Sequence, residues 1–322
     1  NENGPAKLVK MVDNIMRPVG LMNGYELPVS AFTDHADGTF EQGASAYEKR
    51  GVAVMVPEWN NETCVGCNKC AFVCPHATIR PYALSADEKA NAPENTKIAS
   101  KEKLVTGKGY AYTMAVSPLD CMGCGVCVGV CPTNSLKMVA QESQLAQQDV
   151  FDYCVANVEE KKDVATDANV ITSQFKKPLL EFSGSCAGCA ETSYARLITQ
   201  LFGDRMYISN ATGCSSIWGG PAATSPYTTN AEHGYGMYLG QQAIRNRLID
   251  EVKDIAASDK ASDGVKAAAN EYLETLDDGA KNAAASKALV EAIKAAGAGC
   301  DKCSDIVENS EYLSKKSVWI FG

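Results

Sequence analysis

Residues 64–75 read CVGCNKCAFVCP, and residues 121–132 read CMGCGVCVGVCP. Both runs share one spacing, in which cysteines follow the first one at three, six and ten positions and a proline comes directly after the last. The second run begins 57 positions after the first. Because one pattern occurs twice, we expect this part of the chain to fold as two similar halves.

The spacing is typical of loops that bind a [4Fe–4S] cluster, in which the fourth cysteine of each run ligates the other cluster. Three thiolates on a tight loop can face one cube, whereas the fourth points away from it. Small residues between the ligands let backbone N–H groups approach the cluster sulfurs, which influences the reduction potential. We therefore predict one cluster on Cys64, Cys67, Cys70 and Cys131, and a second on Cys121, Cys124, Cys127 and Cys74.

Zinc sites and disulfides are the alternative uses of such cysteines. Zinc sites usually pair two C-x2-C units or include histidine, and the chain contains only three histidines. Disulfide frameworks are typical of short secreted chains. Iron–sulfur ligation is therefore the favoured interpretation.

Length and composition limit the function classes. A chain of 322 residues with 45% hydrophobic residues fits about two globular domains. We expect no membrane span, because no stretch approaches ~18 uninterrupted apolar residues. The net charge of −9 argues against a nucleic-acid partner. Fourteen cysteines favour a reducing, cytoplasmic location.

Apolar residues alternate on both sides of each cysteine run. Residues 52–56 and 110–116 predict strands before the runs, and short segments at 78–80 and 135–139 predict strands after them. We therefore expect a ferredoxin-like two-cluster domain over residues 51–140, with approximate twofold symmetry and a core built around the two clusters.

The rest of the chain divides by composition. Residues 1–50 are expected to be a lead-in segment that packs on the two-cluster domain, and the polar residues 141–177 a solvated linker. Within residues 178–322, a helix starting near Thr192 lies between two short predicted strands, which suggests an α/β domain. Residues 241–299 predict two or three surface helices. The fold class is thus α/β and α+β.

Three further cysteines suggest a third site. Cys186 and Cys189 lie in one glycine-rich loop and Cys214 in another, and both loops follow predicted strand ends, where α/β folds bind ligands. Together they would supply three of the four thiolates of a [4Fe–4S] cluster, although plain buried thiols are an equal alternative. Other candidates for a fourth ligand, none of them favoured, are Cys154 in the linker and the pair Cys300 and Cys303, which we expect to be free at the surface.

Longer motifs resemble those of one enzyme family. They are EFSGSCAGCAET at residues 181–192, LITQLFG at 197–203, NATGCSSIWG at 210–219, LPVSAF at 27–32 and AYEKRGVAV at 46–54. On these motifs, nearly the whole chain is similar to the pyruvate:ferredoxin oxidoreductase family.

The resemblance implies a concrete chemistry. In that family a thiamine diphosphate carbanion attacks the 2-oxoacid, CO2 leaves, and coenzyme A takes the acyl group, while electrons pass singly through clusters to ferredoxin or flavodoxin. Residues 178–322 would begin the thiamine diphosphate-binding domain. Cys186, Cys189 and Cys214 would ligate the cluster nearest the cofactor, and Glu191 and Cys214 would border it. The alternative for Glu191 is an acidic residue favoured by the helix dipole.

The resemblance also implies that the sequence is an internal piece of a longer, homodimeric polypeptide. Residues 1–4 match no natural start, signal peptide or transit peptide, and residues 317–322 predict a strand that stops where a loop would begin. The Mg²⁺-binding loop and the fourth ligand of the third cluster would come after Gly322. Family members usually carry a longer loop between Asn230 and Ala231.

We predict part of an oxidoreductase that decarboxylates pyruvate oxidatively, competent in electron transfer but unable to turn over pyruvate alone. No catalytic residue is assigned. The alternatives are a stand-alone two-cluster electron carrier, a sister enzyme for another 2-oxoacid, and an interaction module without redox function.

Overall fold

The computed structural model describes residues 5–37, 40–203, 206–210, 213–219, 227, 235–297, 302–315 and 317–321. The chain divides into two compact units. The first contains residues 1–203 and 211–230, and the second contains residues 204–210 and 231–321.

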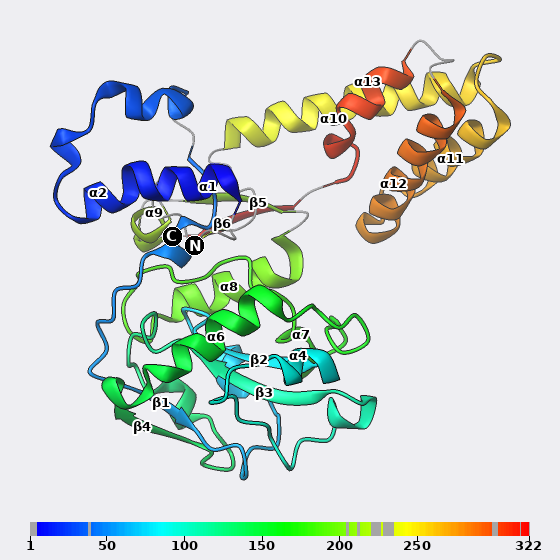
Figure 1. Cartoon of the computed structure of the whole chain (residues 1–322). Coiled ribbons are helices and arrows are strands. Elements are labelled where there is room, and N and C mark those ends of the chain that lie inside the picture. The colour runs from blue at the N-terminus through cyan, green and yellow to red at the C-terminus, as the bar shows by residue number, and fades with distance from the viewer. Residues whose placement is uncertain are drawn as a thin grey trace. The chain divides into compact units, whose positions relative to one another are not determined.

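The first unit is built from short helices and four short strands (Figure 1). Its α-helices are α1 (Ala6–Met11), α2 (Arg17–Gly20), α3 (Lys69–Val73), α4 (Ala86–Ala90), α5 (Val126–Gly129), α6 (Ala146–Asn157), α7 (Val170–Ser173), α8 (Ala190–Phe202) and α9 (Cys214–Trp218). Its strands are β1 (Met55–Trp59), β2 (Ile79–Leu84), β3 (Ala111–Val116) and β4 (Leu136–Ala140). A π-helical turn spans Val12–Met16, and 3₁₀ helices span Gly24–Glu26, Val29–His35, Ala44–Tyr47, Thr106–Lys108 and Gln141–Gln144.

The four strands form two antiparallel pairs that link the halves of the repeat. β1 pairs with β4, and β2 pairs with β3. Each pair therefore joins the strand before one cysteine run to the strand after the other. The predicted strand at residues 52–56 starts later, at Met55, because its partner ends opposite that residue, and Val52 and Val54 are exposed.

The backbone of the two cysteine loops repeats as closely as the sequence does. Residues with positive φ recur 57 positions apart, in the pairs Gly66 and Gly123, Asn68 and Gly125, and Ala77 and Asn134. Positive φ is uncommon outside glycine, so its recurrence at non-glycine positions indicates that both loops follow the same path. In each loop one such residue directly precedes the short helix, α3 or α5.

The main core of the first unit lies around the cysteine loops. Apolar side chains from all four strands share one cluster with buried Cys74 and Cys127, and Cys64, Cys70 and Cys131 pack against it. The ring of Tyr112 lies near Trp59 at 6.2 Å and near Phe175 at 6.1 Å. The core is thus built around the predicted cluster ligands.

The segment expected to be a solvated linker contributes to the core. Helix α6 packs on β3, and its Val150, Phe151 and Cys154 are buried together with Ala115. These three residues lie on one side of a helix, so a single face is apolar even though the segment is polar overall.

The lead-in segment has a small core of its own and contacts later parts of the first unit. Leu8, Met11 and Ile15 pack together. Further along, the Ser45 hydroxyl donates to the Glu181 carbonyl at 2.9 Å, and Lys49 pairs with Asp120 at 2.6 Å.

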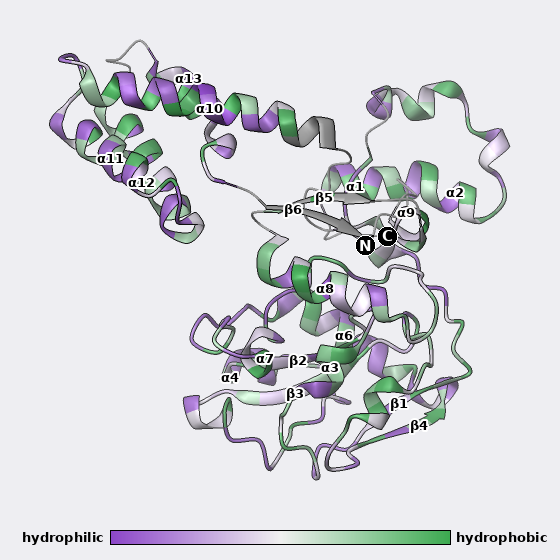
Figure 2. Cartoon of the chain, turned by 180° about the vertical axis from the view of Figure 1, so that it is seen from behind, coloured by the Kyte–Doolittle hydropathy of each residue, from purple (hydrophilic) through white to green (hydrophobic). Residues whose placement is uncertain are grey.

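The second unit is mostly helical. Its elements are α10 (Tyr235–Ala257), α11 (Asp263–Glu274), α12 (Gly279–Ala296), α13 (Cys303–Glu308), a 3₁₀ helix at Ser310–Tyr312, and the parallel strands β5 (Met206–Asn210) and β6 (Ser317–Phe321). The helices predicted within residues 241–299 are confirmed, and so is the strand predicted near the end of the chain. Figure 2 shows hydrophobic residues interspersed with hydrophilic ones along these helices.

The helices of the second unit pack on one another. Leu248 and Val252 of α10, Tyr272 of α11 and Leu289 of α12 share an apolar core. In the described part of the chain, no helix is both long enough and apolar enough to span a membrane.

Candidate iron–sulfur sites

The first candidate site is a cavity between the two cysteine runs. Its wall combines cysteines of both runs with apolar residues of the core, namely Cys64, Cys67, Cys70, Cys131, Trp59, Met114 and Leu136. The structure thus places the fourth cysteine of the second run beside the first three cysteines of the first run. This is the set of four that the sequence assigns to one cluster.

Burial and hydrogen bonding act in opposite directions on these thiols. Burial raises the pKa of Cys64, and it raises that of Cys70 well above its usual value. Burial also acts on Cys131, but N–H groups of Thr133 and Ser135 outweigh it and lower the pKa. The Ser135 N–H lies 3.2 Å from the Cys131 sulfur. Such donors stabilise a thiolate, which is the form that binds iron.

A buried carboxylate lies against the first loop. A side chain at Gly66 would come within 2.2 Å of the Glu102 Cγ, so glycine is needed at this position. Glu102 is buried and accepts the backbone N–H of Val105 at 2.9 Å. The first site therefore has an acidic neighbour.

The second candidate site is more deeply enclosed. Cys74, Cys121 and Cys127 are each 8% exposed. Burial raises the pKa of Cys121 and of Cys127 to about 12, and the Cys74 thiol is a further cause for both. Cys124 also acts on both, and the Gly123 N–H lies 3.4 Å from the Cys121 sulfur. Here the fourth cysteine of the first run lies beside the second run.

The donor set of the first site suits a [4Fe–4S] cluster, because four cysteines line one cavity. In a [4Fe–4S] cube each thiolate binds a different iron, so the four ligands line a shared space instead of converging. The cysteine-lined cavity and the N–H groups at the sulfurs fit such a group.

The loop with Cys186 and Cys189 lies against the second site. A side chain at Gly188 would be 3.6 Å from the Cys124 Cβ. The N–H of Phe182 donates to the His76 carbonyl at 3.1 Å, which fixes the start of this loop to the first cysteine run. Cys186 is exposed and Cys189 is partly buried.

Cys214 lies in a later segment of the chain. It is exposed and is the first residue of α9. A third cluster shared by these three cysteines stays a prediction.

Glu191, at the start of α8, connects α8 with α9. The Trp218 Nε1–H donates to its Oε2 at 3.3 Å, and the Trp218 ring lies 5.9 Å from that of Tyr227. The Glu191 Oε1 and the Tyr227 hydroxyl are buried without a partner among the described residues. Buried polar atoms normally have a hydrogen-bond partner, so this arrangement leaves a place for a polar ligand.

The remaining cysteines do not reach these sites within the described structure. Cys154 is fully buried in α6, and burial raises its pKa to about 12. Cys303 is buried and disulfide-bonded, so the prediction of a free surface pair is wrong for it. The sequence pattern missed that α13 packs on the core of the second unit. Cys300 and the loop at residues 229–234 lie outside the described residues.

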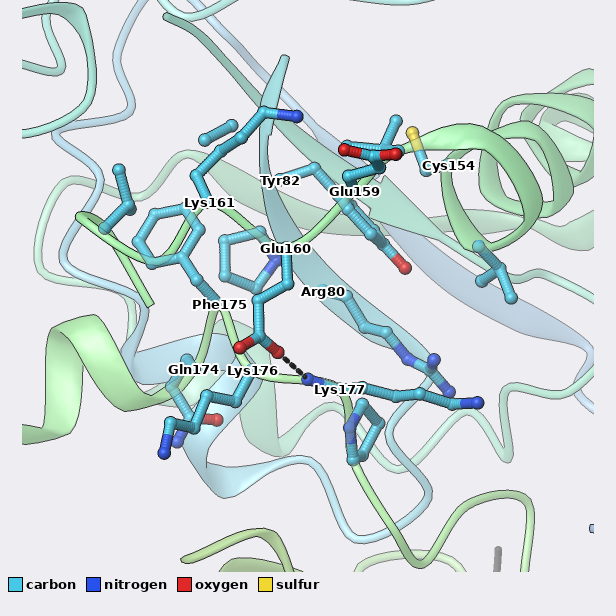
Figure 3. Close-up of a pocket in the computed structure, with 16 residues that line it drawn as sticks. Arg80, Tyr82, Cys154, Glu159, Glu160, Lys161, Gln174, Phe175, Lys176 and Lys177 are labelled. Atoms are coloured by element: carbon cyan, nitrogen blue, oxygen red, sulfur yellow. Dashed lines mark hydrogen bonds between the residues drawn. The ribbon is translucent and has the colours of Figure 1, made fainter. Parts of the chain in front are cut away.

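A separate pocket lies between β2, α6 and the segment that leads into α8 (Figure 3). Its labelled residues include Arg80, Tyr82, Cys154 and Lys161, and the Lys177 N–H donates to the Glu160 carboxylate at 3.2 Å. Arg80 is buried and pairs with Glu181. Apart from Cys154, which was a candidate fourth ligand of the third site, this pocket contains none of the predicted site residues.

Helix α8 turns polar residues inward. Tyr194 is 68% exposed, whereas Thr192, Arg196 and Thr199 are buried. Sequence reasoning missed Arg196, because a charged side chain on a helix is ordinarily exposed to solvent. The one signal in the sequence was a lone arginine between the small residues of the inward face.

Comparisons with known proteins agree with this geometry. The EKR family model, described as a domain of unknown function, matches residues 1–53. A model described as a 4Fe–4S dicluster domain matches residues 63–135, the part that contains both cysteine runs.

Relatives match nearly the whole chain. It is 44% identical to a pyruvate-flavodoxin oxidoreductase from Klebsiella pneumoniae, over 98% of this chain and 28% of the relative. It is 42% identical to a pyruvate:ferredoxin oxidoreductase from Moorella thermoacetica, over 97% of this chain and 28% of the relative. A mitochondrial pyruvate dehydrogenase (NADP+) from Euglena gracilis is 35% identical over 98% of this chain and 18% of its own length.

The chain thus spans less than a third of the length of these relatives. Over almost all of its residues it is homologous to one segment of the pyruvate:flavodoxin and pyruvate:ferredoxin oxidoreductases, and it includes a 4Fe–4S dicluster domain.

Proposed function

We propose that this chain is the electron-transfer segment of an oxidoreductase that converts pyruvate and coenzyme A to acetyl-CoA and CO2. The observation that carries the proposal is the exchange of cysteines between the runs, with Cys131 in the wall of the first site and Cys74 beside the second. Two [4Fe–4S] clusters would be bound there, one on each set of four thiolates. The homology to pyruvate oxidoreductases supports pyruvate as the electron source.

The contacts between the sites suggest an order of electron transfer. Gly188 of the third-site loop contacts Cys124 of the second site. The second site in turn adjoins the first, since the charge of Cys127 contributes to the raised pKa of Cys70. Electrons would pass from the third site to the second, then to the first, and then to a ferredoxin or flavodoxin. The half-exposed Val65 beside Cys64 leaves that last site near solvent.

The neighbourhood of Glu191 supports a thiamine diphosphate site. The buried Oε1 of Glu191 has no partner among the described residues, while its other oxygen is held by Trp218. Glu191 and Cys214 would border the cofactor, and Cys186, Cys189 and Cys214 would hold part of a third cluster. Bound with Mg²⁺, the cofactor would supply the carbanion chemistry that releases CO2 from a 2-oxoacid. Glu191 would fix the position of a polar group through its free oxygen.

Iron and sulfide analysis of the anaerobically purified or reconstituted chain tests the proposal. We expect about eight iron atoms per chain from the two complete sites, and an electron paramagnetic resonance (EPR) signal after reduction with dithionite. A folded chain that binds no iron under these conditions would favour the interaction module and reject the proposal.

The choice between the enzyme segment and a stand-alone electron carrier depends on the residues after the second run. The carrier explains both cluster sites but not the buried Glu191 oxygen. In the full-length enzyme, adding thiamine diphosphate and Mg²⁺ should change the tryptophan fluorescence of the wild type, because Trp218 contacts Glu191, and Glu191→Gln should abolish this change. Equal spectra for the two proteins at saturating cofactor would favour the carrier.

A further inference from the structure

Helix α8 buries a positive charge beside the first cysteine run. Arg196 is 2% exposed. Its Nε donates to the Cys74 carbonyl at 3.0 Å, and its Nη2 donates to the carbonyls of Ala71 at 3.0 Å and Phe72 at 2.7 Å. Its remaining contacts are the side-chain oxygens of Gln174 at 3.4 Å and Gln200 at 3.2 Å. All of these acceptors are neutral.

No carboxylate of the described residues forms an ion pair with Arg196. Arg80, the other buried arginine of this region, does have one, because it pairs with Glu181. The guanidinium of arginine stays charged at neutral pH. A buried charge is unfavourable unless an opposite charge compensates it. An anion bound close to Arg196 would therefore be stabilised.

The second cluster site is the place for that anion. The carbonyls that bind Arg196 are those at the end of α3, which leads directly into Cys74. The hydrogen bond from the Arg196 Nε to the Cys74 carbonyl places the guanidinium beside the residue whose thiolate would ligate the second cluster. A [4Fe–4S] cluster held by four thiolates is an anion, and it gains one more negative charge when it accepts an electron.

We propose that Arg196 is the counter-charge of the second [4Fe–4S] cluster and raises its reduction potential. The inference rests on the proposed function, because it requires that the cluster is bound. Reduction adds one electron to the cluster and breaks no bond, so a fixed positive charge stabilises the reduced form more than the oxidised form. Arg196 is thus a positioning residue that also holds the end of α3, and with it Cys74.

The first site has the opposite electrostatics. Its buried carboxylate, Glu102, lies against the Gly66 loop, where a negative charge disfavours reduction. The two clusters are therefore expected to differ in potential although their loops have the same backbone, and the second should be reduced first.

A potentiometric titration followed by EPR tests this proposal. Wild type, Arg196→Gln and Arg196→Lys are loaded with iron, each in a Cys67→Ser background that removes a ligand of the first site. We expect Arg196→Gln to shift the remaining transition to a more negative potential and Arg196→Lys to stay near wild type. As a control, Arg80→Gln combined with Glu181→Gln removes a neutral buried pair from the same region and should leave the potential nearly unchanged.

The outcomes separate this inference from the proposed function. A wild-type chain without iron would refute the cluster assignment itself. With the wild type loaded, an unchanged potential in Arg196→Gln would overturn the role of Arg196. If Arg196→Gln does not retain the second cluster, Arg196→Lys decides the question. An Arg196→Lys chain with the iron content and potential of the wild type supports the role of Arg196 as counter-charge. Loss of the cluster in both variants overturns that role.

Discussion

The two cysteine sites share a backbone but differ in their surroundings. Their strands, loops and left-handed residues recur 57 positions apart. The second site is nevertheless deeply buried and lies beside Arg196, whereas the first is partly buried and lies beside Glu102. The repeat therefore determines the positions of the cysteine ligands. Residues outside the repeat determine the electrostatic environment, on which the reduction potential of each cluster depends.

Loss of a crossed ligand should have the largest effect. Although Cys131 belongs to the second run, Cys131→Ser is expected to remove the first cluster and about half of the iron, because its sulfur lines the first cavity. Iron analysis and EPR measure the loss. Cys154→Ser is the control, since this buried thiol of α6 touches neither site and should leave the iron content unchanged.

Steric crowding at the second loop should have the next largest effect. A Cβ at Gly123 would lie 2.8 Å from the Met55 carbonyl oxygen, at a φ of 69°. Gly123→Ala is expected to lower the free energy of unfolding by about 3 kcal/mol, from left-handed strain together with a contact that backbone atoms cannot relieve. Gly125→Ala is the matched control, because it has a similar φ and open space, and it should cost only about 1 kcal/mol. Equal losses in anaerobic denaturant titrations would contradict the role of the close contact.

The lead-in segment offers a test of a different kind. Lys49 donates to Asp120 at 2.6 Å, next to Cys121, and burial raises the pKa of that carboxyl group. Lys49→Gln is expected to lower the free energy of unfolding by roughly 2 kcal/mol, less than for a fully buried pair because the lysine is partly exposed. Lys137→Gln, which breaks an exposed pair with Glu58 on the first-site side, should cost under ~0.5 kcal/mol. A similar loss for both would show that Lys49 is an ordinary surface residue.

The smallest effect is expected at a position where the two halves of the repeat carry different residues in the same backbone conformation. Gly125 stands where the first half has Asn68, and both have positive φ. Asparagine tolerates this conformation better than other residues with a side chain. Gly125→Asn should therefore change the free energy of unfolding by less than ~0.5 kcal/mol, and a loss as large as that of Gly125→Ala would show that the two loops are not equivalent.

The sequence was sufficient to predict most of the twofold arrangement. The cysteine spacing predicted which thiols meet, because the spacing determines which ligands one loop can direct at one cluster. Alternating apolar residues located the strands. The strand predicted at residues 52–56 began too early, because β4 has no residue that pairs with Val52 or Val54. These features depend on contacts that are local or repeated.

What the sequence did not reveal depends on contacts between distant segments. Arg196 donates hydrogen bonds to carbonyls more than 120 positions earlier in the chain, which no periodicity within α8 can indicate. The sequence predicts Phe151 and Cys154 to be parts of a polar linker, because their burial depends on the packing of α6 on β3. Cys303 likewise is buried by a core that forms only when α10 to α13 pack together.

A potentiometric EPR titration of the iron-loaded chain, with and without Cys131→Ser, tests the unequal pair of sites most directly. The wild type should show two one-electron transitions, and Cys131→Ser should abolish the one at the more negative potential. A single potential for both clusters, or loss of the less negative transition in Cys131→Ser, would contradict the assignment of Arg196 to the second site and Glu102 to the first.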